Sequence, residues 1–321
     1  MRTLVIAVLL AVGLVTAPAA AEPPVLRIAV LKYGTVNWLT DAILAHDLDA
    51  AAGYRLEAIE LAGRPATSIA FQAGEVDVIV ADWAWALQQR GRGDDLRFAP
   101  YSRALGALMT DGSVDGLCDL KGRPIGVVGG ERDKSWLVLQ SLVRKECGFD
   151  LASESTTLVG AAPLMSQQLL DGAVDAVSTY WNHAAKLEAE GMQRLIGVDE
   201  AMVRLGIEPA PALIGFVWNA ERTPRDLIEA FLRSVAAAQD ILAESDAEWE
   251  RLRPRMEAES DAEFRFLRDY FRAGIARGWR PEDTAAAAAL HRLLVETGGE
   301  VFAAEAGRFD PELFEAPEDG S

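Results

Sequence analysis

The chain has 321 residues, of which 50% are hydrophobic and 25% charged, and its 49 acidic residues outnumber 31 basic ones to give a formal net charge of −18. That length is enough for two domains with cores of their own. The acidity makes nucleic acid and anionic membrane surfaces poor partners, but it says little about a small ligand, because a solvated acidic surface explains it equally well.

The N-terminus has the pattern of a secretory signal peptide. Arg2 precedes an apolar run from Leu4 to Val15, and Ala19-Ala20-Ala21 forms a small-residue cleavage site. We expect residues 1–21 to be removed on export, because the A-x-A ending argues against the alternative of an uncleaved anchor. The mature chain would then have 321 − 21 = 300 residues and, without Arg2, a charge of 30 − 49 = −19.

The mature sequence begins with a β-α-β-α-β pattern. Its first helix opens at Thr35, a plausible N-cap, and its second at Pro65, a favoured first helical residue. Its third strand is a short run rich in Val and Ile, as expected for a strand buried on both faces of a parallel sheet. The predicted elements are strands 26–31, 54–61 and 76–81 and helices 35–51 and 65–73.

A second unit of the same kind follows a break at Asp111-Gly112-Ser113. Before that break, residues 103–109 are predicted to leave the first lobe as a crossing strand. The predicted elements of the second unit are strands 124–128, 156–159 and 174–178 and helices 134–147 and 163–171.

The two units are copies of each other. Gly74-Glu75-Val76-Asp77 recurs as Gly172-Ala173-Val174-Asp175, an offset of 172 − 74 = 98. The residue pairs related by the same offset include Pro65 and Pro163, Trp38 and Trp136, and Trp83 and Trp181. A duplicated supersecondary unit explains this better than chance does.

A late strand at residues 212–218 is predicted to cross back to the first lobe, and two crossings between similar lobes make a hinge. After Thr223-Pro224 the chain reads as helices at 227–242, 262–276 and 284–295. The predicted fold class is α/β, with two Rossmann-like lobes joined by two hinge strands. We expect lobe I to comprise residues 22–105 and 215–321 and lobe II residues 106–214.

The two cysteines are predicted to form a structural disulfide. Cys118 lies just before strand 124–128, and Cys147 closes the helix that follows it. A right-handed strand-helix unit returns the end of the helix to the start of the strand, which brings the two sulfurs together. Export to a compartment where disulfides persist favours the bond.

Four indoles stand just past the strand ends or in the first helical turns that follow, at Trp38, Trp83, Trp136 and Trp181. Ligands bind at the carboxyl ends of strands in open α/β sheets, so these rings are predicted to line a solute site. Two alternatives stay open: the rings belong to the core, or with Asp82 and Glu131 they cage a cation.

The polar candidates are helix starts and nearby charges. The starts at Thr35 to Trp38 and Asp133 to Trp136 expose backbone N–H groups that suit a polar or anionic group, although ordinary capping is the plain alternative. Arg64, Arg132 and Lys134 could add positive charge, and His183 is the histidine best placed for the cleft.

Other polar residues are assigned structural roles. His46 and His291 are predicted to lie on helix surfaces, and Asp77 and Asp175 to lie at strand starts far from the cleft. Asp82, Glu131 and Asp133 could form a hard-cation site only if the lobes bring them together, and no metal site is predicted. The sequence contains no G-x-S-x-G, H-E-x-x-H, phosphate-loop or C-x-x-C motif, so no catalytic residue is predicted.

The layout resembles a known family. The opening Gly34-Thr35, the two Gly-x-Val-Asp motifs, and Asp119-Leu120-Lys121-Gly122-Arg123-Pro124-Ile125-Gly126-Val127 together resemble periplasmic solute-binding proteins of ABC importers. The branch most similar is the one for sulfonates, taurine, nitrate and the pyrimidine precursor of thiamine. The resemblance covers residues 25 to about 300, and Asp119 to Gly122 is its most specific part.

The resemblance implies a type II-like binding-protein fold with the solute between two lobes, and contacts from 34–38, 82–84, 129–136 and 180–183. One departure is that Glu131-Arg132-Asp133-Lys134 stands where sulfonate binders have small hydroxyl residues and glycines, which argues against a simple anionic solute. Together with the residues above, the predicted contacts are Thr35, Val36, Asn37, Trp38, Arg64, Asp82, Trp83, Glu131, Arg132, Ser135, Trp136, Tyr180, Trp181 and His183.

The function implied is that of a monomeric periplasmic binding component that captures a small organic solute and delivers it to an inner-membrane ABC permease, without a cofactor and without catalysis. One alternative is a periplasmic sensor subunit that reports ligand occupancy to a membrane receptor. Another is an enzyme of the thiamine-precursor type on the same fold, against which the predicted export argues.

Overall fold

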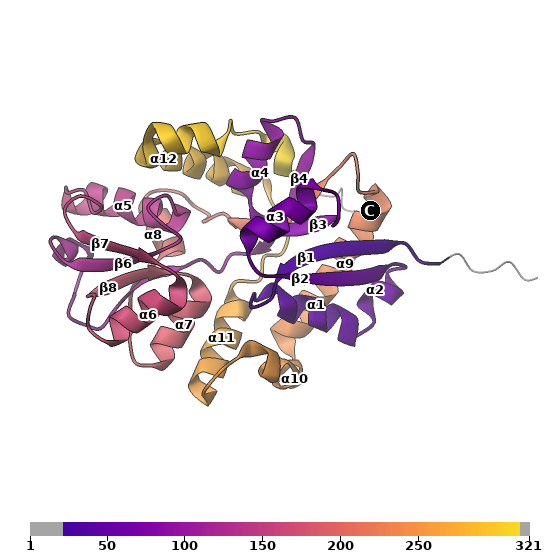
Figure 1. The fold of residues 1–321 in the computed structure, drawn as a ribbon, viewed down its shortest axis with the longest axis horizontal. Helices are drawn as coiled ribbons and strands as arrows, with labels where there is room; N and C mark the ends of the chain where they lie inside the picture. The colour runs from indigo at the N-terminus through magenta and orange to yellow at the C-terminus, as the bar shows by residue number, and fades with distance from the viewer. Residues whose placement is uncertain (1–21, 315–321) are drawn as a thin grey trace, which may run out of the picture.

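The computed structural model describes residues 22–314, so the predicted signal peptide lies outside the described residues. The chain forms two lobes side by side, each built on a five-stranded mixed sheet covered by helices (Figure 1). This arrangement confirms the predicted two-lobed α/β fold class.

The first sheet has the strand order β2-β1-β3-β10-β4. Its strands are β1 (Val25–Leu31), β2 (Arg55–Leu61), β3 (Val78–Asp82), β4 (Leu96–Ser102) and β10 (Ile214–Asn219). β1 pairs parallel with both β2 and β3, whereas β10 runs antiparallel between β3 and β4. The three parallel strands therefore end at the same edge of the sheet.

The second sheet repeats this plan in the order β7-β6-β8-β5-β9. Its strands are β5 (Ala107–Thr110), β6 (Pro124–Val128), β7 (Thr156–Gly160), β8 (Ala176–Thr179) and β9 (Gln193–Gly197). β6 pairs parallel with β7 and β8, and β5 runs antiparallel between β8 and β9. The 98-residue repeat thus corresponds to two sheets with the same topology. In each, the strand at the fourth position across the sheet, β10 or β5, runs antiparallel to its neighbours.

Helices cover both faces of each sheet. In the first half of the chain they are α1 (Val36–Ala45), α2 (Leu48–Ala51), α3 (Arg64–Gln72), α4 (Trp83–Arg90), α5 (Lys134–Cys147), α6 (Ala162–Leu170), α7 (Trp181–Ala189) and α8 (Val198–Arg204). After β10 they are α9 (Arg225–Glu244), α10 (Asp246–Met256), α11 (Asp261–Ala273) and α12 (Pro281–Ala306), with short 3-10 turns at η1 (Leu117–Leu120) and η2 (Pro311–Phe314).

The chain crosses between the lobes twice, after β4 and before β10. Arg103 holds the first crossing in place: its backbone N–H donates to the Gly274 carbonyl at 2.7 Å, and its guanidinium donates to the Ala210 carbonyl and to Asp283 Oδ1, both at 2.9 Å. Asp283 lies in the first turn of α12 and is fully buried. One arginine therefore ties both crossing segments to the C-terminal helices.

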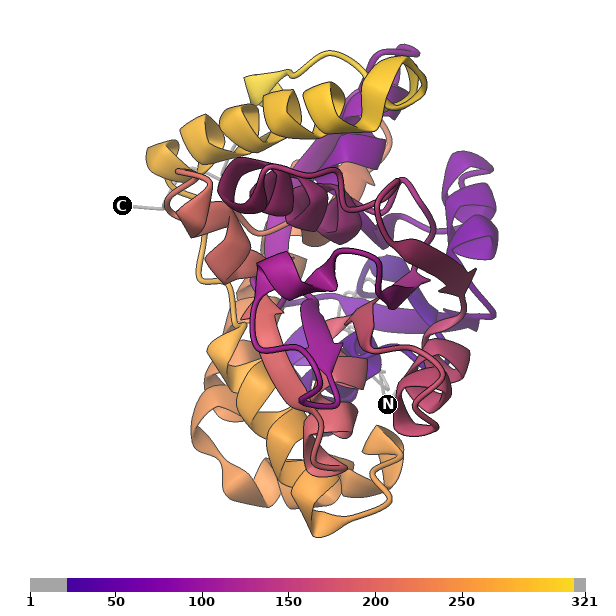
Figure 2. The same cartoon turned by 90° about the vertical axis from the view of Figure 1, so that its left-hand side faces the viewer.

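Two C-terminal helices contact both lobes. α11 packs against α7, and α12 packs against both α5 and α4. Figure 2 shows the yellow α12 running along one side of the molecule and the orange helices lying on the opposite side. The division of the chain into residues 22–105 with 215–321 and residues 106–214 stays a prediction, because helices in the last segment bridge the lobes.

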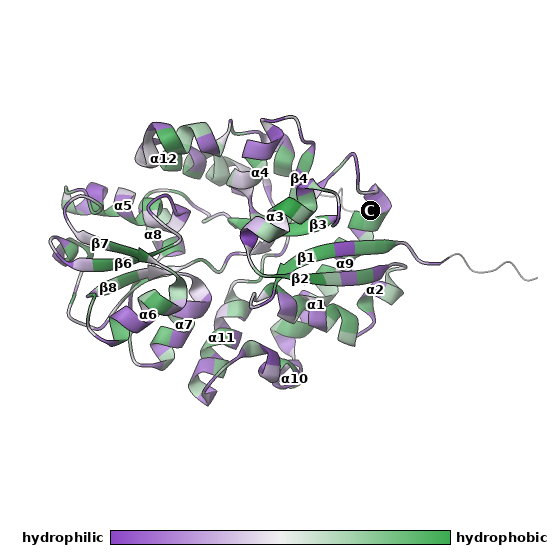
Figure 3. Cartoon of the chain, in the orientation of Figure 1, coloured by the Kyte–Doolittle hydropathy of each residue, from purple (hydrophilic) through white to green (hydrophobic). Residues whose placement is uncertain are grey.

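Figure 3 shows hydrophobic residues along the strands of both sheets and a mixture of hydrophobic and hydrophilic residues along the helices. One core cluster joins the lobes, because Leu290 and Leu294 of α12 belong to the same cluster as Leu87 of α4 and Leu137 of α5. Within residues 22–314, no helix combines the length and the low polarity needed to cross a bilayer.

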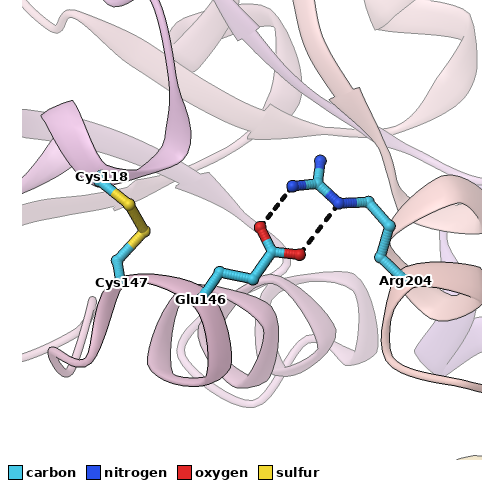
Figure 4. The surroundings of a disulfide bond; sticks show 4 residues. All are labelled: Cys118, Glu146, Cys147 and Arg204. Atoms are coloured by element: carbon cyan, nitrogen blue, oxygen red, sulfur yellow. Dashed lines mark hydrogen bonds and ion pairs between the residues drawn. A yellow bond between two sulfur atoms is a disulfide. The ribbon is translucent and has the colours of Figure 1, made fainter.

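The predicted disulfide is confirmed. Cys118 in η1 and Cys147 at the end of α5 are bonded, with their Cα atoms 5.3 Å apart (Figure 4). One residue before Cys147, Glu146 pairs with Arg204 of α8, whose Nε donates at 3.0 Å. The end of α5 is thus attached to η1 and to α8.

Some elements differ from the sequence expectations. β9 and α8 were not predicted, and the first crossing strand begins at Ala107 rather than at residue 103. The surface assignment of His291 is wrong, because this ring is only 8% exposed and lies 3.1 Å from the Gly307 carbonyl under the C-terminal turn. The structural roles of Asp77 and Asp175 agree with their contacts to Arg27 and Arg123 at strand starts.

Candidate functional site

A cavity of about 300 Å³ lies between the lobes, where the parallel strands of both sheets end. Its volume is at the low end of the range for ligand pockets, roughly 300–1,000 Å³. Both lobes and both crossing segments line it. The lining includes Leu31, Thr35, Arg64 and Asp82 from the first lobe, Ser102, Leu105, Gly106 and Leu213 from the crossings, and Asp133, Lys134, Ser135, Tyr180, Trp181 and His183 from the second lobe.

A wider groove of about 870 Å³ continues from the cavity toward α6, α10 and α11. The two spaces share Tyr33, Thr35 and His183 at their junction. The groove is larger, but it touches neither the crossing segments nor the strand ends of the second sheet. We therefore take the smaller cavity as the binding site and the groove as its approach from solvent.

An ion pair spans the cavity from one lobe to the other. Asp82, the last residue of β3, accepts from the Trp85 N–H at 2.9 Å through Oδ1 and from Lys134 Nζ at 3.1 Å through Oδ2. Burial pushes the pKa of Asp82 up, but the nearby charges of Lys134 and Arg64 outweigh burial and hold that pKa below its ordinary value. Asp82 is therefore ionised and caps α4 while it binds the first residue of α5.

A second carboxyl, Asp133, caps α5. Its Oδ1 accepts from the N–H groups of Ser135 at 2.9 Å and Trp136 at 3.4 Å. Burial raises its pKa above the ordinary value, although the charge of Lys134 and the capping bonds act in the opposite direction. Asp133 and Asp82 thus differ in their proton affinity because only Asp82 has a direct cationic partner.

Three further polar side chains of the cavity are Arg64, Tyr180 and His183, and none of them forms an ion pair within residues 22–314. Arg64 opens α3, and its guanidinium has no ion-pair partner among residues 22–314. Burial raises the pKa of the Tyr180 hydroxyl, and the charge of Asp133 adds to that effect. Burial, with a smaller contribution from Lys186, lowers the pKa of His183 from 6.5 to about 4. The imidazole is therefore neutral near pH 7.

Two of the four predicted indoles reach the solute space. Trp181 lines the cavity and is 9% exposed, and Trp38 touches the outer groove while being 4% exposed. The two rings meet edge-to-face with centroids 6.1 Å apart, and both contact Phe271 of α11. They form an aromatic wall whose inner faces belong to the core.

The other two indoles do not line the cavity, so the prediction that they line a solute site is wrong. Trp83 is 0% exposed and packs against Phe309, Phe314 and His291, and Trp136 is 1% exposed in the core cluster beneath α12. Both rings follow a strand as predicted. Each turns away from the cavity because α12 offers an apolar surface on the other side.

The loop between β6 and α5 contributes less than expected. Glu131 and Arg132 are exposed and lie outside the cavity, and Arg132 Nη1 binds Glu305 Oε1 of α12 at 2.8 Å. Only the end of the loop, from Asp133 to Ser135, reaches the cavity. The segment Glu131-Arg132 therefore connects the second lobe to α12.

The β1–α1 loop is positioned by one of its own side chains. Asn37 is buried, and its Nδ2 donates to the carbonyls of Leu31 at 2.9 Å and Lys32 at 3.0 Å. Asn37 borders only the outer groove, whereas Thr35 and Val36 line the cavity. Asn37 thus shapes the loop that presents its neighbours.

Several lining residues fall outside the predicted contacts, among them Tyr33, Thr67, Tyr101 and Ser102. Tyr101 is the clearest omission, because it donates to the Thr35 carbonyl at 3.2 Å and lies at the end of the strand that leads into the first crossing. Burial raises the pKa of its hydroxyl strongly. Its position before a crossing was the signal that could have identified it.

These features define a two-lobed α/β protein with a polar, partly aromatic cavity at its hinge. Residues 103–248, just under half of the chain, match the protein family described as NMT1/THI5 like. No curated protein matches the sequence. Within residues 22–314, no group of three His, Cys, Asp or Glu side chains is arranged to hold a metal ion.

The fold is similar to solved binding proteins. The alkanesulfonate-binding protein SsuA from Xanthomonas axonopodis pv. citri bound to MOPS has a TM-score of 0.65 at 17% identity, covering 92% of this chain and 98% of that one. The periplasmic aliphatic sulphonate binding protein SsuA from Escherichia coli has a TM-score of 0.67 at 15% identity, covering 85% and 91%. The chain thus has the two-lobed fold of periplasmic binding proteins, as the sequence resemblance implied.

One similar structure is an enzyme. The desulfurization enzyme DSZB has a TM-score of 0.62 at 16% identity, covering 92% of this chain and 97% of that one. At these identities the likeness concerns the fold alone, so the choice between binding and catalysis depends on the cavity.

Proposed function

We propose that the protein is a periplasmic solute-binding component of an ABC importer, which captures a small organic solute between its lobes and delivers it to a membrane permease. The observation that carries the proposal is the cavity itself, enclosed by both lobes and both crossing segments. A solute there would contact groups whose relative position depends on the hinge. Binding would thereby be coupled to a change in shape that a partner can recognise.

We propose binding rather than turnover. Both cysteines are joined in a disulfide away from the cavity, and the cavity carboxyls Asp82 and Asp133 are held as helix caps. These groups suit a fixed polar lining. If a bound solute were recovered chemically changed after incubation with the purified protein, catalysis would replace binding as the function.

Native mass spectrometry of freshly purified protein, followed by a thermal-shift screen, tests the proposal. A ligand of the native state must raise the melting temperature, in proportion to RT ln(1 + [L]/Kd) at constant unfolding entropy. A retained solute should raise it again when added back to protein refolded without it. Absence of any retained molecule together with no stabilising solute in a broad screen would contradict the proposal.

Matched variants locate the site. Tyr180→Phe and Trp181→Ala change residues of the cavity lining and should weaken binding of the recovered solute. Glu131→Gln changes an exposed residue outside the cavity and should leave affinity unchanged. Equal affinity in all three variants would place the solute elsewhere.

A further inference from the structure

We infer that the solute is dipolar, with an anionic group bound beside Arg64 of the first lobe and a positively charged N–H group bound between Asp133 and Tyr180 of the second lobe. The inference rests on the proposed function, because it concerns the same cavity. It specifies the class of solute through the charges that the two lobes bring together.

The charges that line the cavity are balanced but not fully paired. Lys134 and Asp82 satisfy each other at 3.1 Å. The other two, Arg64 and Asp133, come from opposite lobes, and neither has an ion-pair partner in the described part of the chain. The positive charge of Arg64 acts to lower the pKa of both Asp82 and Asp133, so the guanidinium is close enough to interact with both carboxyls. The Arg64 guanidinium and the Asp133 carboxyl therefore remain available to a solute.

Two acceptors share one space in the second lobe. Asp133 uses Oδ1 to cap α5, whereas its Oδ2 and the Tyr180 hydroxyl have no hydrogen-bond partner within residues 22–314. Both atoms lie against Gly129, where a Cβ would come within 2.6 Å of Asp133 Oδ2 and 2.9 Å of the Tyr180 hydroxyl. An ammonium group has three donors and can bind both acceptors at once. A residue with a Cβ at position 129 would collide with both acceptor atoms, so glycine is required for them to occupy these positions.

A solute with a negative charge alone fits this lining poorly. Placed beside Arg64, it would leave the Asp133 carboxyl, whose pKa burial already raises, without a cationic partner in a partly desolvated space. His183 supplies no compensating charge, because its pKa is lowered to about 4. A dipolar solute carries its own cation to Asp133 and keeps the cavity neutral.

The test compares probes with the same number of carbon atoms that carry an anionic group, an ammonium group, or both. In one series 3-aminopropane-1-sulfonate is set against propane-1-sulfonate and propylamine, and in a second 4-aminobutyrate is set against butyrate and butylamine. Affinities come from thermal shift and calorimetry with the full mature protein. At least one dipolar probe should bind about tenfold or more tighter than the anion and the amine of its series, equivalent to one charged contact.

A variant at Asp133 assigns the preference to that carboxyl. Asp133→Asn keeps an oxygen that can cap α5 but removes the charge, so the dipolar probe should lose its advantage over the matched anion. The control is Glu131→Gln, two residues earlier and outside the cavity, which should retain the full preference. Circular dichroism and the melting temperature of each free variant confirm that it is folded.

The outcomes separate this inference from the proposed function. If an anion binds wild-type protein as tightly as its dipolar counterpart, or if Asp133→Asn keeps the preference, the dipolar assignment is wrong and the solute-binding function stands. The same holds if neither dipolar probe binds but another solute does. If no probe binds and the purified protein carries no small molecule, both proposals fail.

Discussion

Single side chains in this protein connect parts of the chain that are distant in sequence. Asp82 caps α4 in the first lobe and binds Lys134 at the start of α5 in the second, so one carboxylate fixes a helix start and a contact across the cavity. At the hinge, the Arg103 guanidinium likewise joins distant segments, because it donates to the Ala210 carbonyl before β10 and to Asp283 at the start of α12. The relative position of the lobes is thus set by a few charged groups as well as by apolar packing.

Trp83, the first residue of α4, should matter for stability rather than for binding. Trp83→Ala removes a fully buried ring from its contacts with Phe309 and Phe314, and we expect a loss of about 3–5 kcal/mol in the free energy of unfolding. Urea denaturation measures the loss, and Tyr33→Ala, at an exposed ring, is the control. A change of less than about 1 kcal/mol would contradict the packing described for this ring.

His183 predicts a pH dependence of stability. Burial lowers its folded pKa to about 4 from 6.5, so the unfolded chain binds the proton more readily than the folded one between these values. This residue should therefore destabilise the fold progressively as pH falls from 6.5 toward 4. His183→Gln should show a shallower loss of stability over that range, and an equal slope in both proteins would refute the low pKa.

The sequence located the strand ends and the helix starts of the site, but it could not give the direction of each side chain there. Trp83 and Trp181 occupy matching positions in the repeat, yet only Trp181 reaches the cavity. The difference comes from the C-terminal helices: α12 and η2 cover Trp83 completely, whereas Trp181 contacts Phe271 of α11 and still lines the cavity. Their contact with the repeat is a tertiary effect that no local pattern around either tryptophan encodes.

At the scale of elements, local patterns were most informative in the repeated units. Strand β6 and helix α5 were predicted with their observed bounds, because a Gly- and Pro-flanked apolar run and a periodic helix leave little ambiguity. By contrast, α12 extends over Pro281–Ala306, whereas the sequence predicts only residues 284–295, mostly in its first half. Gly299 has a left-handed, non-helical backbone (φ 68°, ψ −166°), so α12 is kinked there and continues to Ala306 as a second helical segment.

The disulfide should stabilise the second lobe. It joins residues 29 positions apart and links η1 to the end of α5, so removing it increases the freedom of the unfolded chain. We expect Cys118→Ala/Cys147→Ala to lose about 2–4 kcal/mol in the free energy of unfolding. Reductant should lower the melting temperature of the wild type but not of the double variant. If both proteins respond equally, the effect of reductant lies elsewhere.

For the whole molecule, the main feature is that one core cluster runs through both lobes, in addition to a cluster mostly in the first lobe and a smaller one wholly in the second. α12 carries Leu290 and Leu294 into a cluster that includes residues of both sheets, and α11 packs against α7, where Tyr270 donates to Glu188 Oε2 at 2.5 Å. Any motion about the two crossings must therefore carry these helices along or slide them over one lobe. The hinge strands alone do not define the moving parts.

Shared packing predicts cooperative unfolding. We expect a single transition in urea, with tryptophan fluorescence and far-ultraviolet circular dichroism giving the same midpoint, because neither lobe can lose its core while α12 stays docked. Calorimetric and van't Hoff enthalpies should agree in the same conditions. Two resolved transitions, one for each lobe, would show that the joint cluster contributes little.

The aromatic group around the C-terminal turn has a consequence for optical assays. Trp279 stacks on Phe314 with ring centroids 4.4 Å apart, and Trp83 lies beside the same phenylalanine. The emission of these two indoles will respond when the last turn lifts off, whether or not a molecule has entered between the lobes. A titration followed by total tryptophan emission therefore also reports on this turn, and replacing Trp279 by Phe would remove one of the two indoles that contact Phe314.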